Sequence, residues 1–268
     1  MSICYRCFRI VFAIGFQELR TLVEHLKPKN MSLLKYLLLA AVILGLPPMV
    51  AAQVTPGVYK ASEPLENGTR NYLLLVSDAY MVHTVYDSNP AHFNSTMGGF
   101  FTVEADSLKA RLEFNSEFEK TGEKQYHVAI GYSDGNLILN GNQDRPYVRQ
   151  PELEQALDGL WLFATQGPDT GQERRGDTQP RKTLKFLQDG YFQWIAYNTE
   201  TMDFRGSGGG RYAALEGTYT EVIQFFSRDD SRVGAELNFQ YERQENDWHH
   251  KGKNSRGEPM YEIWTLRE

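Results

Sequence analysis

The residues best suited to chemistry lie in the C-terminal third of the chain and centre on one glutamate. Glu221 stands in the alternating run Tyr219-x-Glu221-x-Ile223-x-Phe225. Side chains two residues apart share one face of a β-strand, so the three apolar or aromatic neighbours predict that this face points inward. A buried carboxylate needs hydrogen-bond donors or a cation. Glu221 is therefore a candidate ligand anchor, a candidate acid/base group, or part of a structural hydrogen-bond network.

The turn that precedes this run decides which residue faces Glu221. If Glu216-Gly217 forms a two-residue hairpin loop, Tyr212 lies opposite Glu221 on the same face. A register slip of one residue would bring Arg211 there instead. The sequence leaves both partners open.

Trp248, His249 and His250 follow one another in a second strand-like segment. Adjacent strand residues point to opposite faces, so the two histidines cannot enter one metal site. His250 could line a cavity or lie at a rim. The chain also lacks Gly-x-Ser-x-Gly, His-Glu-x-x-His and Walker signatures, and we assign no catalytic residue, metal or cofactor.

These residues belong to a unit that the chain contains twice. Residues 181–227 align without a gap on residues 70–116, at an offset of 111 positions. The identical pairs fall on aromatic and turn residues: Arg70/Arg181, Leu73/Leu184, Asp78/Asp189, Tyr80/Tyr191, Tyr86/Tyr197, Phe93/Phe204, Gly98/Gly209, Gly99/Gly210, Phe114/Phe225 and Ser116/Ser227. Such positions are the ones a fold constrains, which predicts two domains of one β-rich design.

The second copy reads as eight strands in sequential antiparallel order. They are expected at residues 159–163, 183–187, 191–197, 211–215, 218–226, 234–242, 247–251 and 260–266. Eight such strands close into an up-and-down barrel with room for one small ligand. We expect the glycine run at residues 208–210 to reflect close backbone approach or a bend, because no helix follows to make it a phosphate loop.

Several short motifs add a resemblance to this pattern. They are Gly159-x-Trp161, Asp189-Gly190-x-Phe192, Gly210-Arg211-Tyr212, the Glu221 run, Trp248-x-His250-x-Gly252 and Glu262-x-Trp264. Together they resemble the lipocalin-like (calycin) domains of uncharacterised exported bacterial proteins, over residues 157–268. The resemblance implies a small β-barrel with an internal cavity and no known reaction. The first copy departs from it, since Leu108 and Ala110 replace Tyr219 and Glu221.

The N-terminal region reads as an export signal. From Met31, a short segment with Lys35 leads into an apolar run and a small-residue ending, which predicts cleavage between Ala52 and Gln53. A retained membrane anchor is the alternative, because residues 33–52 could span a bilayer. Residues 1–30 then look like a spurious extension, and the Cys4-x-x-Cys7 pair lies inside it.

Charge and boundaries complete the expectations. Six of the 28 Lys/Arg and two of the 34 Asp/Glu precede Gln53, which leaves a net charge of −10 for residues 53–268. So acidic a body disfavours nucleic-acid binding. The predicted fold is all-β, with two tandem antiparallel up-and-down barrels. The predicted segments are a spurious extension (1–30), a signal peptide (31–52), a degenerate first barrel (53–142), a linker (143–156) and a second lipocalin-like barrel (157–268).

The sequence thus predicts an exported, periplasmic or secreted protein, more plausibly a binder than an enzyme, whose second barrel takes a small, partly apolar molecule. The predicted site residues are Trp194, Arg211, Tyr212, Tyr219, Glu221, His250, Glu262 and Trp264. Two alternatives stay open: an envelope interaction module with filled barrels, and a hydrolase or isomerase using Glu221 with His250. The sequence predicts neither the ligand nor the oligomeric state.

Overall fold

The computed structural model describes residues 54–253 and 257–267, and their regular secondary structure is almost entirely β-strand. The helical elements within them are short: α3 (Phe118–Thr121) and the 3-10 turn η2 (Asp230–Arg232). The predicted extension, signal peptide, cleavage site and Cys4-x-x-Cys7 pair lie outside the described residues. Within residues 54–253 and 257–267, no helix has the length and apolar character needed to cross a bilayer.

The first sheet has eight strands, each antiparallel to its neighbours. They are β1 (Gly57–Pro64), β2 (Thr69–Val76), β3 (Tyr80–Ser88), β4 (His92–Glu104), β5 (Ser107–Asn115), β6 (Gln125–Ser133), β7 (Asn136–Leu139) and β8 (Val148–Arg149). Strand β8 pairs with β1, and a single bridge between Leu137 and Tyr147 links β7 to the start of β8. The sheet is therefore a nearly closed barrel. It includes β8, which falls inside the segment expected to be a linker.

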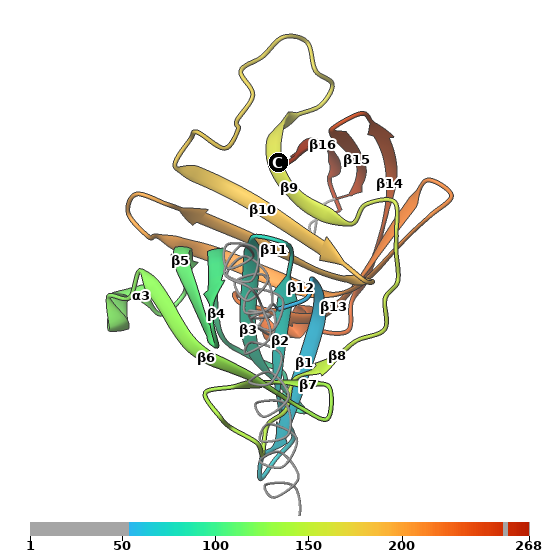
Figure 1. Ribbon diagram of the computed structural model, residues 1–268. Coiled ribbons are helices and arrows are strands. Elements are labelled where there is room, and N and C mark those ends of the chain that lie inside the picture. The colour runs from blue at the N-terminus through green and yellow to red at the C-terminus, as the bar shows by residue number, and fades with distance from the viewer. Residues whose placement is uncertain (1–53, 254–256, 268) are drawn as a thin grey trace, which may run out of the picture. The chain divides into compact units, whose positions relative to one another are not determined.

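The second sheet closes completely, in the predicted sequential order (Figure 1). Its strands are β9 (Gly159–Gln166), β10 (Arg181–Gln188), β11 (Tyr191–Asn198), β12 (Phe204–Leu215), β13 (Thr218–Phe226), β14 (Glu236–Gln244), β15 (Asp247–Lys253) and β16 (Pro259–Leu266). Strand β16 pairs with β9 and completes the ring. The predicted fold class, two tandem antiparallel barrels, is confirmed.

Tight turns explain why consecutive strands pair. Asp189-Gly190, between β10 and β11, and Glu216-Gly217, between β12 and β13, take positive φ angles at both residues. Two such residues form the hairpin turn whose twist matches that of the strands, and glycine adopts the second position without strain. Both turns are two-residue hairpins, the arrangement considered from the sequence for Glu216-Gly217, and they fix the register of the strands that carry the candidate site.

The duplication extends to irregularities of the backbone. The register shifts between Val85 and Tyr86 and again between Ala196 and Tyr197, 111 residues later. It also shifts at the double glycines of β4 and β12. A Cβ atom added to Gly99 or Gly210 would lie 2.0 Å from a carbonyl oxygen of the neighbouring strand. The glycines thus permit close backbone approach at a bulge, one of the two roles expected for them.

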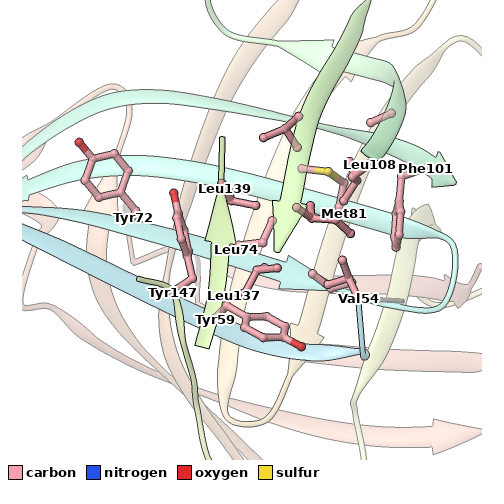
Figure 2. Packing of buried hydrophobic residues seen from close by; sticks show 14 of the residues in the cluster. Val54, Tyr59, Tyr72, Leu74, Met81, Phe101, Leu108, Leu137, Leu139 and Tyr147 are labelled. Atoms are coloured by element: carbon pink, nitrogen blue, oxygen red, sulfur yellow. The ribbon is translucent and has the colours of Figure 1, made fainter. Parts of the chain in front are cut away.

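Each barrel has its own core. The first barrel is filled by aliphatic and aromatic side chains such as Tyr59, Leu74, Met81 and Leu137, which point toward one another from several strands (Figure 2). The second barrel encloses a more aromatic cluster that includes Trp161, Phe192, Tyr219 and Trp248.

A third cluster joins the outer faces of the two barrels through repeat-related residues. The rings of Tyr86 and Phe225 lie 4.9 Å apart, and those of their counterparts Tyr197 and Phe114 lie 5.1 Å apart. The rings of Phe93 and its own counterpart Phe204 stack on each other at 6.1 Å. Each copy therefore presents the same surface to the other, as the subunits of a two-fold homodimer do.

Buried polar contacts also cross this interface. The guanidinium of Arg267, after β16, contacts both carboxylate oxygens of Glu113 on β5 at 2.8 Å. The hydroxyls of Tyr80 and Tyr197 donate to the same carboxylate at 2.9 and 2.8 Å. Both barrels belong to one compact unit. Separating them would expose an apolar face and an unpaired buried charge, so experiments on either barrel require the whole chain.

Candidate functional site

Strand alternation puts four ionisable side chains inside the second barrel. They are Lys185 on β10, Glu221 on β13, His250 on β15 and Glu262 on β16, and the first three of these residues are at most 5% exposed. The register pairs Tyr212 with Glu221, as the two-residue turn predicts. Phe225 does not share this inward face, because the bulge at the glycines turns it toward the first barrel.

Lys185 is the partner of Glu221. Its ammonium donates to a Glu221 carboxylate oxygen at 2.9 Å, and the two side chains are only 7% and 6% exposed. Neither Arg211 nor Tyr212, the partners considered from the sequence, makes this contact. The sequence carried a signal for Lys185: it alternates with Leu187 within residues 184–187, which are otherwise apolar, so it shares the inward face.

The two other candidate partners lie elsewhere. The Arg211 guanidinium lies over the Tyr191 ring at 3.8 Å, on the opposite face of β12, so Arg211 is not part of the interior. The Tyr212 hydroxyl donates to Asp158 at the end of the barrel where β12 turns into β13. Burial and the neighbouring Asp158 raise the pKa of Tyr212, so it stays a neutral donor. Tyr212 therefore belongs to the barrel floor.

Aromatic rings surround the Lys185 ammonium. Its nitrogen lies 5.1, 4.9 and 5.2 Å from the ring centroids of Tyr219, Trp248 and Trp264. A cation is attracted to the negative face of an aromatic ring, most strongly where water is excluded. The predicted wall residues Tyr219 and Trp264 thus do line the interior, and they contact a charge supplied by the barrel itself.

His250 and Glu262 form a second, looser pair. The His250 Nδ1 atom is 3.6 Å from a Glu262 oxygen, which also accepts a hydrogen bond from Trp264 Nε1 at 3.1 Å. Burial, with a smaller effect of Lys185, lowers the pKa of His250 to about 4, so the ring is neutral at pH 7. Burial alone would raise the pKa of Glu262, but His250 and Lys185 outweigh it and the carboxyl group stays ionised.

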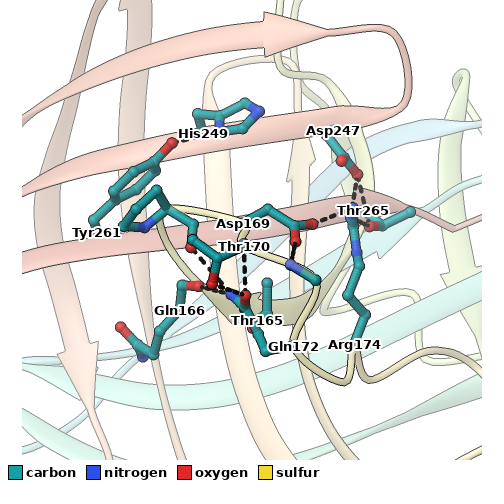
Figure 3. Close-up of polar contacts among 12 residues, drawn as sticks. Thr165, Gln166, Asp169, Thr170, Gln172, Arg174, Asp247, His249, Tyr261 and Thr265 are labelled. Carbon is teal, nitrogen blue, oxygen red and sulfur yellow. Dashed lines mark hydrogen bonds and ion pairs between the residues drawn. The ribbon is translucent and has the colours of Figure 1, made fainter.

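His249 confirms the prediction about adjacent histidines. Its ring contacts the Tyr261 hydroxyl at 2.8 Å on the outer side of the barrel, as Figure 3 shows. His250 points inward and is 2% exposed. Among residues 54–253 and 257–267, no group of three or more His, Cys, Asp or Glu side chains is placed to hold a metal ion.

Three interior side chains have buried polar atoms without a hydrogen-bond partner among the described residues. They are the hydroxyl of Tyr219, Nε1 of Trp248 and both ring nitrogens of His250, whose Nδ1 lies 3.6 Å from Glu262, too far for a hydrogen bond. Their rings lie within 5.6 Å of one another. Most buried polar groups in folded proteins are paired, because an unpaired one costs about 1–3 kcal/mol. Such a cluster is typical of an interior that offers hydrogen bonds to another molecule.

The two ends of the second barrel differ in exposure. At the floor, Trp161 and Trp248 are fully buried, and Trp161 Nε1 donates to the Leu157 carbonyl at 2.8 Å. Toward the other end, the inward-facing side chains of Phe163, Trp194 and Phe226 are only half-buried. The polar layer therefore lies between a sealed floor and an end where interior side chains reach solvent, which we call the open end.

The loop between β9 and β10, residues 167–180, is much longer than its counterpart between β1 and β2. Gln172 and Arg174 hold it against the outer wall (Figure 3). Arg174 donates to Asp247 at 2.6 Å and to Thr265 at 2.8 Å. The next residue, Arg175, lies over the ring of Phe163 at 4.2 Å, so the loop brings a cation to the open end.

A pocket of about 580 Å³ lies between this loop and β16, outside the barrel interior. Two of its arginines have acidic partners: Arg174 contacts Asp247 at 2.6 Å, and Arg267 contacts Glu113 and Asp177 at 2.8 and 2.7 Å. The third arginine of its lining, Arg175, lies over the Phe163 ring. Within the described part of the chain, the pocket has no cluster of unpaired polar side chains like that of the barrel interior, which is therefore the stronger candidate site.

Known proteins give no further guide to this site. A scan against protein-family models finds no match for the chain, and a search of curated proteins finds no similar sequence. The function must therefore be argued from the interior of the second barrel.

Proposed function

We propose that the second barrel binds a small, partly apolar molecule and that the first barrel is its scaffold. The observation that carries this proposal is the cluster of unpaired polar atoms on Tyr219, Trp248 and His250, enclosed by aromatic rings. A ligand site typically combines an apolar wall with a few polar groups that orient the ligand. The half-buried rings of Phe163 and Trp194 at the open end would contact its apolar part.

Two observations favour binding over the alternatives. A filled interaction module would bury its inward-facing rings, whereas those at the open end are partly exposed. An acid/base pair would require Glu221 and His250 to converge, yet Glu221 is bound to Lys185 and the carboxylate nearest to His250 is Glu262. The proposal includes export, with Gln53 as the first mature residue, which N-terminal sequencing of the natural protein would test.

Tryptophan fluorescence provides a direct test, because all four tryptophans belong to the second barrel: Trp161, Trp194, Trp248 and Trp264. The neutral apolar dye N-phenyl-1-naphthylamine, titrated into the chain from residue 53, should quench them and accept their excitation energy. The variant Phe163→Ala removes a half-buried ring at the open end that the dye would contact and should weaken dye binding on the order of tenfold.

The control for that variant is Val222→Thr, which alters the outward-facing neighbour of Glu221 and should leave binding unchanged. Dye binding that is equal in all three proteins would refute the interior as the site. No energy transfer in any of them would refute ligand binding by this barrel.

A further inference from the structure

Only one of the two carboxylates inside the second barrel is in contact with a cation. Lys185 is neutralised by Glu221 at 2.9 Å, but the ion-pair contact of Glu262 among the described residues is with His250, which is neutral at pH 7. The Glu262 side chain is also 20% exposed, against 6% for Glu221, so it is the more accessible of the two interior carboxylates. The interior therefore contains one carboxylate without a cation in contact with it, because Lys185, which also lowers the pKa of Glu262, is bound to Glu221.

Aromatic faces in this barrel already accommodate cations. Lys185 lies among three rings, and Arg175 of the long loop lies 4.2 Å over Phe163 at the open end. Burial and the neighbouring Arg181 lower the pKa of Arg175, and the negative charge of Glu262 opposes this shift. No carboxylate of the described chain forms an ion pair with Arg175. The loop between β9 and β10 thus brings a cation to a ring beside the Glu262 carboxylate.

We infer that the ligand is an organic cation joined to a flat apolar group, and that Arg175 occupies part of its position. This inference rests on the proposed function. The cation would pair with Glu262 and lie on the rings of Phe163 and Trp264, which themselves pack edge to face at 5.7 Å. An anion would be repelled by the Glu262 carboxylate, and a neutral molecule would leave Glu262 without a cation in contact, so both would bind less tightly.

The test uses three probes of one shape and different charge: phenethylammonium, phenylacetamide and phenylacetate. Each is titrated into the chain from residue 53 at pH 7, with tryptophan emission as the signal. The ammonium should bind on the order of tenfold more tightly than the amide, the usual scale for adding one charged hydrogen bond, and the acetate most weakly.

Two variants identify the groups responsible. Glu262→Gln keeps the size of the side chain and should abolish the preference for the ammonium over the amide. Arg175→Gln removes the competing cation and should tighten ammonium binding about threefold, with little effect on the amide. The control is Glu242→Gln on β14, an exposed glutamate, which should change neither constant.

The outcomes separate this inference from the proposed function. If the acetate or the amide binds best, or if the preference for the ammonium survives in Glu262→Gln, the ligand is not a cation held by Glu262, although binding by the barrel stands. If neither these probes nor the neutral dye binds, both proposals fail. Circular dichroism of each variant checks that the fold is intact.

Discussion

The two barrels share one wall design and differ in what it encloses. At positions related by the 111-residue offset, Lys185, Glu221 and His250 of the second barrel correspond to Leu74, Ala110 and Leu139 of the first. All six are buried. The same strands therefore enclose an apolar core in one copy and a polar layer within aromatic rings in the other.

The first barrel also has buried polar groups, and atoms of Asn94, Arg145 and Arg149 are unpaired there, but the histidine and tyrosine side chains of its interior have partners. His83 contacts the Tyr147 hydroxyl at 2.9 Å, and the Tyr72 hydroxyl donates to Glu63 at 2.6 Å. In the second barrel the polar atoms of Tyr219, Trp248 and His250 lack such partners. Duplication thus allowed one copy to keep a conventional core while the other acquired groups that a stable core alone does not require.

The largest expected effect comes from breaking the contact that unites the copies. Glu113→Ala removes the buried carboxylate that accepts from Arg267, Tyr80 and Tyr197 and leaves Arg267 only the half-exposed Asp177, so the free energy of unfolding should fall by about 3–5 kcal/mol. Urea titration followed by tryptophan emission and by far-ultraviolet circular dichroism should show one shared transition. The control is Gln224→Ala at the repeat-related position, which is half-buried and uncharged and should cost about 1 kcal/mol or less. Equal losses would mean that the interface is symmetric in energy as well as in shape.

Removing one partner of the Lys185–Glu221 ion pair should lower the free energy of unfolding much more than replacing both partners by apolar residues. Glu221→Ala leaves the Lys185 ammonium buried without a counter-ion and should destabilise the chain by about 3 kcal/mol. The double variant Lys185→Met/Glu221→Leu, which makes this interior resemble that of the first barrel, should recover most of the loss. Urea denaturation measures both. If the double variant is as unstable as Glu221→Ala, the pair is a structural requirement, and the contrast between the barrels loses its functional meaning.

Because of His250, the free energy of unfolding of the chain should depend on pH. Its pKa is about 4 in the folded chain, below the value of 6.5 for an exposed histidine, so protons bind preferentially to the unfolded state. The stability that the neutral His250 ring contributes to the folded chain is complete above pH 6.5 and decreases as the pH falls toward 4. Between pH 7 and pH 5 the free energy of unfolding should drop by about 2 kcal/mol from this group.

The matched variants for that experiment are neighbours on β15. His250→Gln should remove most of the decrease, whereas His249→Gln, on the outer face, should retain it. Urea titrations at pH 7, 6 and 5 supply the slopes. A wild-type stability that does not change over this range would show that His250 is solvated in the folded state.

The sequence predicted the architecture because its signals are local. Two-residue turns such as Asp189-Gly190 fix neighbouring strands, and the repeat fixes their order. It also predicted the inward position of Glu221 and the opposed faces of His249 and His250. It could not predict the partner of Glu221, because Lys185 lies 36 residues away and reaches it only when the barrel closes.

Bulges account for the other differences between expectation and structure. Strict alternation from Tyr219 assigns Phe225 to the interior, but the close approach of Gly210 to the next strand inserts an extra residue and reverses the faces beyond it. The short β8 pairs with β1 through only two residues, Val148 and Arg149, which is too little for a period-two pattern. The pattern of one sequence therefore does not predict which distant strands close the barrel or where a single extra residue forms a bulge.

The smallest expected effect compares two repeat-related tyrosines at the interface between the barrels. Tyr197 donates to the charged Glu113 at 2.8 Å, while Tyr86 meets the neutral Gln224 at the longer distance of 3.5 Å. A hydrogen bond to a charged group contributes more than one between neutral groups, so Tyr197→Phe should cost about 2 kcal/mol and Tyr86→Phe less than about 1 kcal/mol. Both variants keep the ring packing, and urea denaturation compares them directly. Equal costs would mean that the Glu113 charge adds nothing to this contact, and that the two copies differ only in the interiors they enclose.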